Sequence, residues 1–390
     1  MAGSTIDHLI AMTIFLGALL ILISLFNQTI QTAVLYQRNR AIATKCSDLL
    51  DNIILNPGSP LQYEEDTPIE WGKLDCTPVI FGLQDPEFSQ YRLSPFSLMR
   101  LLSSSNIVTY SRTGISYSKT SVSWGSFLYI SCDKVLNYQT VATLLGLNGS
   151  YGFQLTFQPI INVSVSKIPS SDLTLKVSAK GAAMPLTNAK VTYMLIKIEE
   201  APNGYPTFAI FNGTVQTDGY GEASLTFSGV NGESDAYALV AYVNFNGLVG
   251  VGYYNHATVP LDEYVVPLVD NFEKRRVTLT HSWIINGEEI EATSELRYTA
   301  TFLILTEDFN LRMLSLEENS FGSVRYSNGV EEAYGVINIP TYNPGILAVA
   351  FSNNRGGYGF VMMPWGVSTM AFPVVFGDNP SGRTLSLIHI

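Results

Sequence analysis

The feature that most constrains this chain is an uncharged apolar stretch close to its N-terminus. Residues 9–26 read LIAMTIFLGALLILISLF and contain no charged side chain. As an α-helix with a rise of about 1.5 Å per residue, they would span about 27 Å, close to the hydrocarbon thickness of a bilayer. No second stretch of this kind occurs in the chain. The sequence therefore predicts a single membrane-spanning helix, with most of the protein on one side of the membrane.

The helical pattern continues beyond the apolar stretch. Apolar residues recur at spacings of three, four and seven as far as Ile54, and polar residues fill the other positions. Neither Pro nor Gly occurs between Ala18 and Asn56, and Pro57-Gly58 then ends the pattern. We expect one helix within residues 1–57. Its first half is apolar all round, and its second half has one apolar stripe that can lie on a globular domain of the same chain.

This arrangement resembles the N-terminal region of type IV pilins and their relatives. If a leader is removed between Ala2 and Gly3, Asp7 becomes the fifth residue of the mature chain. The resemblance implies leader processing at Ala2 and Gly3. It also implies that the Asp7 carboxylate pairs with the free N-terminus of a neighbouring subunit, since a buried carboxylate needs a partner. Two features depart from the family: Met1 stands where Lys or Arg is usual, and Asp replaces the commoner Glu. The structural alternative for Asp7 is a residue that stabilises the first helical turn.

Two other interpretations of the N-terminus stay open. A cleaved secretory signal needs a basic start and a small-x-small site, and both are missing here, whereas an uncleaved signal anchor needs neither. The basic residues Arg38, Arg40 and Lys45 follow the span, and the positive-inside rule would then place the large domain in the cytoplasm. Pilin-like helices insert with the N-terminus inside, and the composition favours the exterior. We therefore expect the bulk of the chain to be extracellular.

The composition is typical of β-sandwich proteins. Only 14% of the residues are charged, against about 25% in average soluble domains, and Tyr and Phe number 21 and 20. Aromatic and β-branched residues favour strands. The net charge of −11 makes a nucleic-acid partner unfavourable. The predicted fold is mainly β, with one long N-terminal helix followed by a pilin-like α+β region and one or two β-sandwiches.

Residues 58–167 form the predicted α+β head region. Ser94-Pro95 introduces one short helix and residues 138–147 form another, ended by Gly146. Alternating apolar residues from Tyr151 to Val165 predict one long strand. A helix ending in Leu-Gly, followed by such a strand, is similar to the head region of archaeal pilin-like membrane proteins.

Residues 168–260 form the clearest module. Five to seven short strands separated by turn signals predict a β-sandwich. The pattern P-L-x-x-A-x-V followed by T-D-x-x-G-x-A resembles bacterial immunoglobulin-like and carboxypeptidase-regulatory-like domains. Asp218 in this pattern could bind calcium, but a hairpin turn whose Asp bonds its own backbone is the simpler interpretation. Residues 261–384 predict a second β-rich domain in the form of an incomplete sandwich, with a boundary near Tyr264–Pro267.

The last six residues, 385–390, read LSLIHI. They resemble the in-frame translation of a sequencing adapter, so we exclude them from the fold. This interpretation implies that the natural protein continues past Thr384. The alternative is a genuine apolar tail.

Three cysteines and several Asn-x-Ser/Thr sequons bear on whether the protein lies in an oxidising exterior. Cys76 and Cys132 could form a disulfide in an oxidising exterior, which would leave Cys46 free. Asn148, Asn162 and Asn212 are candidate N-glycosylation sites, while the sequon at Asn27 lies at the end of the membrane span and is a poor acceptor. Chance sequons are the alternative in a chain rich in Asn, Ser and Thr.

No catalytic or cofactor-binding motif is present in the sequence, and no cluster of metal-ligating residues has suitable spacing. The first hypothesis is a non-catalytic filament subunit or minor pseudopilin. Residues 9–54 would contact the membrane, copies of the same chain or other pilin-like subunits. The second is a signal-anchored adhesin or carbohydrate-binding surface protein. The third is an enzyme whose active site lies past Thr384. The ligand is not identified by the sequence.

Overall fold

The structure is a computed structural model, and it describes most of the chain. The described residues are 2–64, 67–88, 92–102, 106–121, 127–147, 152–170, 172–182, 184–200, 203–258, 263–286, 290–316, 319–366 and 374–377. The chain divides into two compact units, residues 1–55 and 56–390, and each is described by itself. The tail 385–390 and the sequon at Asn148 lie outside the described residues.

The first unit is a single helix, α1 (Ala2–Leu55), of 54 residues. Gly17 is its one glycine past the first turn, and several threonine hydroxyls, such as those of Thr13 and Thr29, donate to the carbonyl four residues earlier. The helix ends two residues before Pro57, because a proline disfavours helical geometry in the residue that precedes it. The long N-terminal helix is confirmed, while the packing of its second-half stripe on a globular domain stays a prediction.

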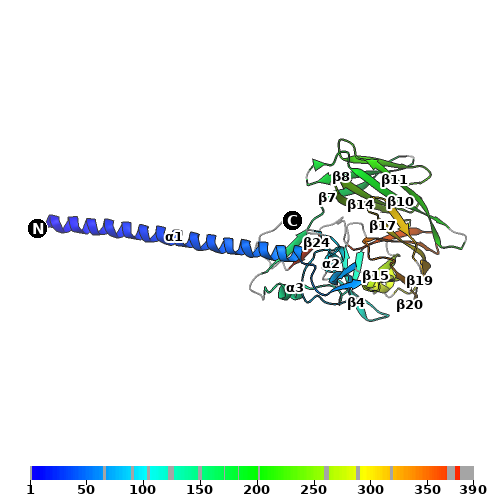
Figure 1. The fold of residues 1–390 in the computed structure, drawn as a ribbon, viewed down its shortest axis with the longest axis horizontal. Coiled ribbons are helices and arrows are strands. Elements are labelled where there is room, and N and C mark those ends of the chain that lie inside the picture. The colour runs from blue at the N-terminus through cyan, green and yellow to red at the C-terminus, as the bar shows by residue number, and fades with distance from the viewer. Residues whose placement is uncertain are drawn as a thin grey trace. The chain divides into compact units, whose positions relative to one another are not determined.

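The second unit is the body of the protein. One part of it is a β-sandwich of two antiparallel sheets. The outer sheet has the order β12-β8-β7, and the second sheet has the order β11-β10-β13-β14. Figure 1 shows these strands in green, grouped together in the body. Their bounds are β7 (Ile161–Ile168), β8 (Leu173–Gly181), β9 (Met184–Pro185, paired with β8), β10 (Lys190–Glu200), β11 (Pro206–Gln216), β12 (Glu222–Phe227), β13 (Tyr237–Phe245) and β14 (Leu248–His256).

On one side of this sandwich, two glycines of β14 let the two sheets approach each other closely. An added Cβ at Gly250 would lie 2.8 Å from the Ile161 side chain, and one at Gly252 would lie 2.7 Å from that of Val163. Strand β14 therefore approaches β7 more closely than any larger residue would allow. The apolar side chains of both sheets, including Leu175, Leu195 and Leu239, fill the space between them.

A third sheet covers the other face of the second sheet. Its order is β20-β19-β17-β22-β23, with β18 paired to β17. One core joins Val240 and Met194 of the second sheet to Ala348 and Met362 of the third. The central strands β10 and β13 of the second sheet are therefore buried on both faces. The bounds are β17 (Thr293–Leu305), β18 (Leu311–Leu314), β19 (Phe321–Ser327), β20 (Val330–Ala333), β22 (Gly345–Asn353) and β23 (Tyr358–Trp365).

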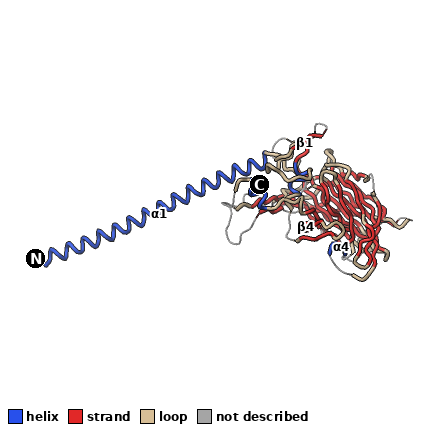
Figure 2. Tube along the Cα trace, turned by 90° about the horizontal axis from the view of Figure 1, so that it is seen from below, coloured by secondary structure: helices blue, strands red, loops and turns tan. Residues whose placement is uncertain are grey.

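The fourth sheet, of order β21-β16-β15-β5-β4-β3, packs against the remaining face of the third. Phe272, which follows β15, stacks on Trp365 of β23 at 5.6 Å, and His281 of β16 bonds Ser294 of β17. Most of the strands in Figure 2 accordingly form one red block within the body, and β1 lies apart from it. The bounds are β3 (Ile107–Tyr110), β4 (Ile115–Ser121), β5 (Phe127–Ser131), β15 (Val265–Asn271), β16 (Arg276–His281), α4 (Ser282–Asn286) and β21 (Gly335–Asn338).

Strand pairing in the fourth sheet crosses the predicted domain boundaries. β5, from region 58–167, pairs in parallel with β15, from region 261–384. β6 (Gln154–Phe157) likewise pairs with β24 (Val374–Gly377). The domain division as a whole stays a prediction, but these two regions share sheets and do not build separate ones.

The remaining elements are short. Ser94 accepts a hydrogen bond from the Ser97 N–H and caps α2 (Pro95–Met99), and Asn137 caps α3 (Tyr138–Leu144), so both predicted helices are confirmed. The other elements are β1 (Leu61–Glu64), β2 (Thr67–Glu70) and the 3₁₀ turn η1 (Trp71–Lys73). The prediction of a single long strand up to about residue 165 was wrong. β6 and β7 belong to different sheets, and Pro159 between them has no N–H to continue a ladder.

Candidate functional site

The apolar segment of α1 is the first candidate site. It lies in the one helix of the described residues that is long and apolar enough to cross a membrane, and none of its most apolar window is buried. Leu19, Ile21 and Leu22 expose 41%, 64% and 67% of their surface. Consecutive helical residues point in different directions, so every face of this segment is apolar and uncovered. Such a surface needs lipid or other apolar helices around it.

Asp7 lies on the exposed surface of α1 at the start of this segment. The first Lys or Arg of the chain is Arg38, about nine helical turns further on. The helix itself therefore offers this carboxylate no basic partner nearby other than the neighbouring His8. The structure places the backbone of Ala2 and Gly3 in the first turn of α1.

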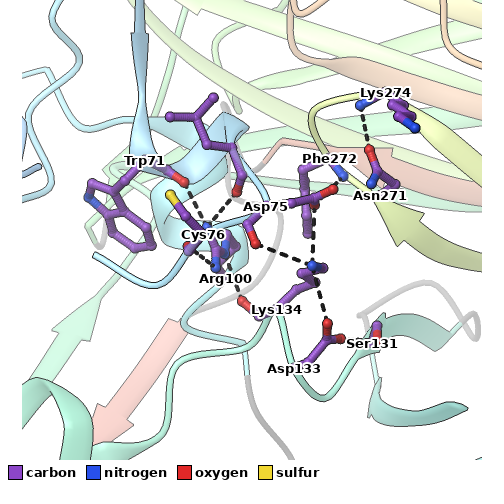
Figure 3. A network of polar contacts seen from close by, with 11 residues as sticks. Trp71, Asp75, Cys76, Arg100, Ser131, Asp133, Lys134, Asn271, Phe272 and Lys274 are labelled. Carbon is purple, nitrogen blue, oxygen red and sulfur yellow. Dashed lines mark hydrogen bonds and ion pairs between the residues drawn. The ribbon is translucent and has the colours of Figure 1, made fainter. Parts of the chain in front are cut away.

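Arg100 is the centre of a polar network in the body, and sequence reasoning missed it. The side chain is fully buried. Its Nη1 donates to the carbonyls of Trp71 and Leu74 at 2.6 and 2.8 Å, its Nη2 to that of Cys76 at 2.8 Å, and its Nε to that of Lys134 at 2.7 Å. Figure 3 shows these carbonyls converging on the guanidinium. Desolvation lowers the pKa of Arg100 to about 10, so it stays charged at neutral pH.

The network continues into the C-terminal half of the body. Lys134 Nζ lies 3.1 Å from Asp133 and 3.8 Å from Asp75. Asp75 Oδ1 in turn accepts a hydrogen bond from the Phe272 N–H at 3.0 Å. Because the donors of Arg100 point at backbone carbonyls of its own chain, this side chain fastens loops together. The sequence signal was a charged residue between Met99 and Leu101 in an otherwise apolar run.

Cys76 and Cys132 border this network as free, half-buried thiols, and Cys46 of α1 is also free. Burial raises the pKa of both Cys76 and Cys132. In Figure 3 the Cys76 sulfur lies on the Trp71 side of Arg100, away from Ser131 and Asp133, which flank Cys132. Neither thiol forms a disulfide in the structure, and the pairing of Cys76 with Cys132 stays a prediction.

A second set of buried charges lies at the end of β2 and in the 3₁₀ turn η1 that follows it. Glu70 accepts a hydrogen bond from the Ser94 hydroxyl at 2.7 Å and lies 3.3 Å from Lys73 Nζ. Lys73 also contacts Glu87 at 2.8 Å. Burial raises the pKa of Glu70, and Lys73 opposes this effect. Each of these charges has an ion-pair partner within the chain, which indicates a structural role.

Two carboxylates fasten the β3–β4 hairpin to the later strands. Glu331 accepts hydrogen bonds from the hydroxyls of Tyr110 and Thr280. Asp270 accepts them from Tyr117 and Thr278. Burial raises the pKa of Glu331, while its two hydroxyl donors act in the opposite direction.

The hydrogen bonds of the His281 ring indicate a structural role. Its Nδ1 accepts from the Trp283 N–H at 3.2 Å, so its Nε2 carries the proton and donates to Ser294 Oγ at 3.1 Å. A general base would need to accept from the serine. Burial lowers the pKa of His281 to about 4. Within the described ranges, no group of three or more His, Cys, Asp or Glu side chains could hold a metal ion.

Two predicted sequons lie on exposed strand positions. Asn162 is exposed on β7, and Asn212 is exposed on β11. Asp218 accepts from the N–H groups of Tyr220 and Glu222 at 2.8 and 2.9 Å, which confirms the turn interpretation for this aspartate.

Comparisons with known proteins add little to this description. No family model matches the chain, and no curated protein matches it. A red sea bream transglutaminase is similar over 73% of this chain and 40% of its own, with 10% identity and a TM-score of 0.20. The FN1-FN3 domains of chicken CNTN1 are similar over 53% of this chain and 67% of theirs, with 17% identity and a TM-score of 0.14. Likenesses this weak carry no argument about fold or activity.

Proposed function

We propose that this chain is a membrane-anchored surface protein with an extracellular body, and that it is a pilin-like subunit or minor pseudopilin assembled through α1. The observation that carries the proposal is the uncovered apolar surface of α1, none of whose most apolar window is buried. Two large cores of the body consist of body residues alone. Lipid covers the helix before assembly, and neighbouring helices cover it afterwards.

Two properties of the chain support the extracellular side. Charged residues make up only 14% of it, and the sequons at Asn162 and Asn212 are exposed. The basic residues that follow the span favour the opposite orientation. Insertion with the N-terminus inside, as in pilin-like proteins, resolves this conflict.

Asp7 supports assembly over a simple anchor. A carboxylate at the edge of an apolar helix is costly to transfer into an apolar environment unless it gains a partner. The helix supplies no Lys or Arg before Arg38. A new N-terminus at Gly3 of a neighbouring copy would supply a positive charge at the right end of the helix.

The test is N-terminal sequencing of the full chain after expression with an archaeal prepilin peptidase. We expect the membrane-associated product to begin at Gly3 and the Ala2→Asp variant to keep Met1. An Asp7→Asn variant should still be cleaved but should lose assembly into filaments, which separates processing from assembly. An intact Met1 in the parent chain would reject the pilin-like role and leave a signal-anchored surface protein.

One observation favours adhesion as the second candidate function. Tyr63 and Tyr220 expose 69% and 80% of their surface on the body. Exposed aromatic rings stack on sugars and on protein ligands. Binding of polysaccharide by the uncleaved chain, lost in Tyr63→Ala or Tyr220→Ala, would favour this alternative.

A further inference from the structure

Strand β11 forms a long open edge of the second sheet. Among the described strands it pairs with β10 alone, over all of residues 206–216 and without a register shift. Near its start, Thr299 Oγ1 donates to the Pro206 carbonyl at 2.6 Å. Beyond that residue its outer edge faces no other strand of its sheet in the part of the chain that the structure describes. Such an edge presents backbone donors and acceptors to any strand that can reach it.

The other sheet edges among the described strands are protected, and β11 is not. β3, β20 and β21 have four residues each, and β7 lies against β14. β23 contains Pro364 and is bonded to Thr258 at Tyr358, while β12 has six residues and carries Glu222. Short strands, prolines, charges and covering segments are the usual means of blocking an edge. β11 reads PTFAIFNGTVQ, with no charge and no proline after its first residue.

We propose that a second copy of this chain adds to β11 in the antiparallel direction and joins the two second sheets into one continuous sheet. Because β11 is uncharged, pairing with itself opposes no like charges within the new ladder. A two-fold axis near Phe211 makes the contact self-complementary. Ile210, which is 45% exposed, gains apolar contact close to this axis.

The charges on β10 weakly favour the antiparallel direction, because the two β11 strands between them keep these charges about 14 Å apart. Lys190 pairs with Gln216 at one end of β11, whereas Glu199 and Glu200 pair with Thr207 and Pro206 at the other end. Antiparallel addition places the glutamates of one copy level with Lys190 of the other. Parallel addition would place like charges at the same level, which is unfavourable. This contact lies in the body and goes beyond the proposed assembly through α1.

Photo-crosslinking of the full chain in dodecylmaltoside micelles tests the proposal. Ile210 is replaced by p-benzoylphenylalanine, and unlabelled protein is mixed with isotope-labelled protein, both made in a host without N-glycosylation. After irradiation, mass spectrometry identifies mixed-label adducts. We expect them to map to residues 206–216 of the second copy. The same photoreactive residue at Ser224, exposed on β12, should give no such adduct.

A substitution that adds a charge near the two-fold axis provides the second part of the test. In Asn212→Lys two lysines approach across the two-fold axis, so the adduct yield should fall by about fivefold or more, while Ser224→Lys leaves it unchanged. Asn212 is exposed, and circular dichroism verifies that the variant is folded. Absence of the adduct, adducts that map outside 206–216, or an unchanged yield in Asn212→Lys would overturn the proposal. Association through α1 alone would give one of these results.

Discussion

The outer sheet and the second sheet consist of similar strands but differ in how many faces are covered. In β8, Leu173, Leu175 and Val177 are buried, and the residues between them are partly exposed. In β13, every residue from Tyr237 to Val243 is buried. The outer sheet has one covered face, whereas the second sheet lies between the outer and third sheets.

This difference explains the composition of the chain. Alternation of apolar and polar residues marks a strand with one covered face, and a continuous apolar run marks a strand covered on both. The runs in β13, β22 and β23 are of the second kind. The low charged fraction therefore has a source in the stacked inner sheets of the body as well as in α1.

The largest expected effect comes from a charge between the second and third sheets. Val240→Asp buries an unpaired carboxylate, so the free energy of unfolding should fall by more than about 4 kcal/mol. Ser224→Asp, on the exposed face of the outer sheet, should change it by less than about 0.5 kcal/mol. Urea unfolding followed by tryptophan fluorescence measures both. Similar losses in the two variants would contradict the covering of the second sheet by the third.

The local elements of the fold were predictable, and the stacking was not. The caps at Ser94 and Asn137 and the end of α1 before Pro57 follow from local chemistry. The pairing of Ile130 with Val269 joins residues far apart in the chain, and no local pattern encodes it. A strand buried on both faces also loses the alternation that would reveal its neighbours.

The candidate sites follow the same division. The apolar run of α1 and the turn at Asp218 were predictable because their meaning depends on neighbouring residues. The Arg100 network was missed, because its acceptors at Trp71 and Lys134 come from separate loops. A lone arginine in an apolar run shows that a partner is needed but not which backbone supplies it.

The second expected effect concerns pH and the inner position of His281, between the third and fourth sheets. Its pKa is about 4 in the folded state against 6.5 ordinarily, so the unfolded state binds the proton more strongly between these values. The free energy of unfolding should therefore fall as pH drops from about 6.5 to about 4, by about 3 kcal/mol. In His281→Asn this contribution is absent. Unfolding measured across this range should give a steeper decline for the parent chain, and identical slopes would argue against a buried neutral His281.

The smallest expected effect tests the side on which the outer and second sheets meet. Gly252→Ala places a Cβ 2.7 Å from the Val163 side chain and 2.9 Å from its backbone carbonyl, which cannot move without shifting β7. We expect a loss of about 1–3 kcal/mol in the free energy of unfolding. Gly219→Ala is the matched control, because nothing lies within 4 Å of its added Cβ, and it should be neutral or slightly stabilising. If both variants were equally stable, β7 and β14 would not be in contact, and the sandwich would have two further open edges besides β11.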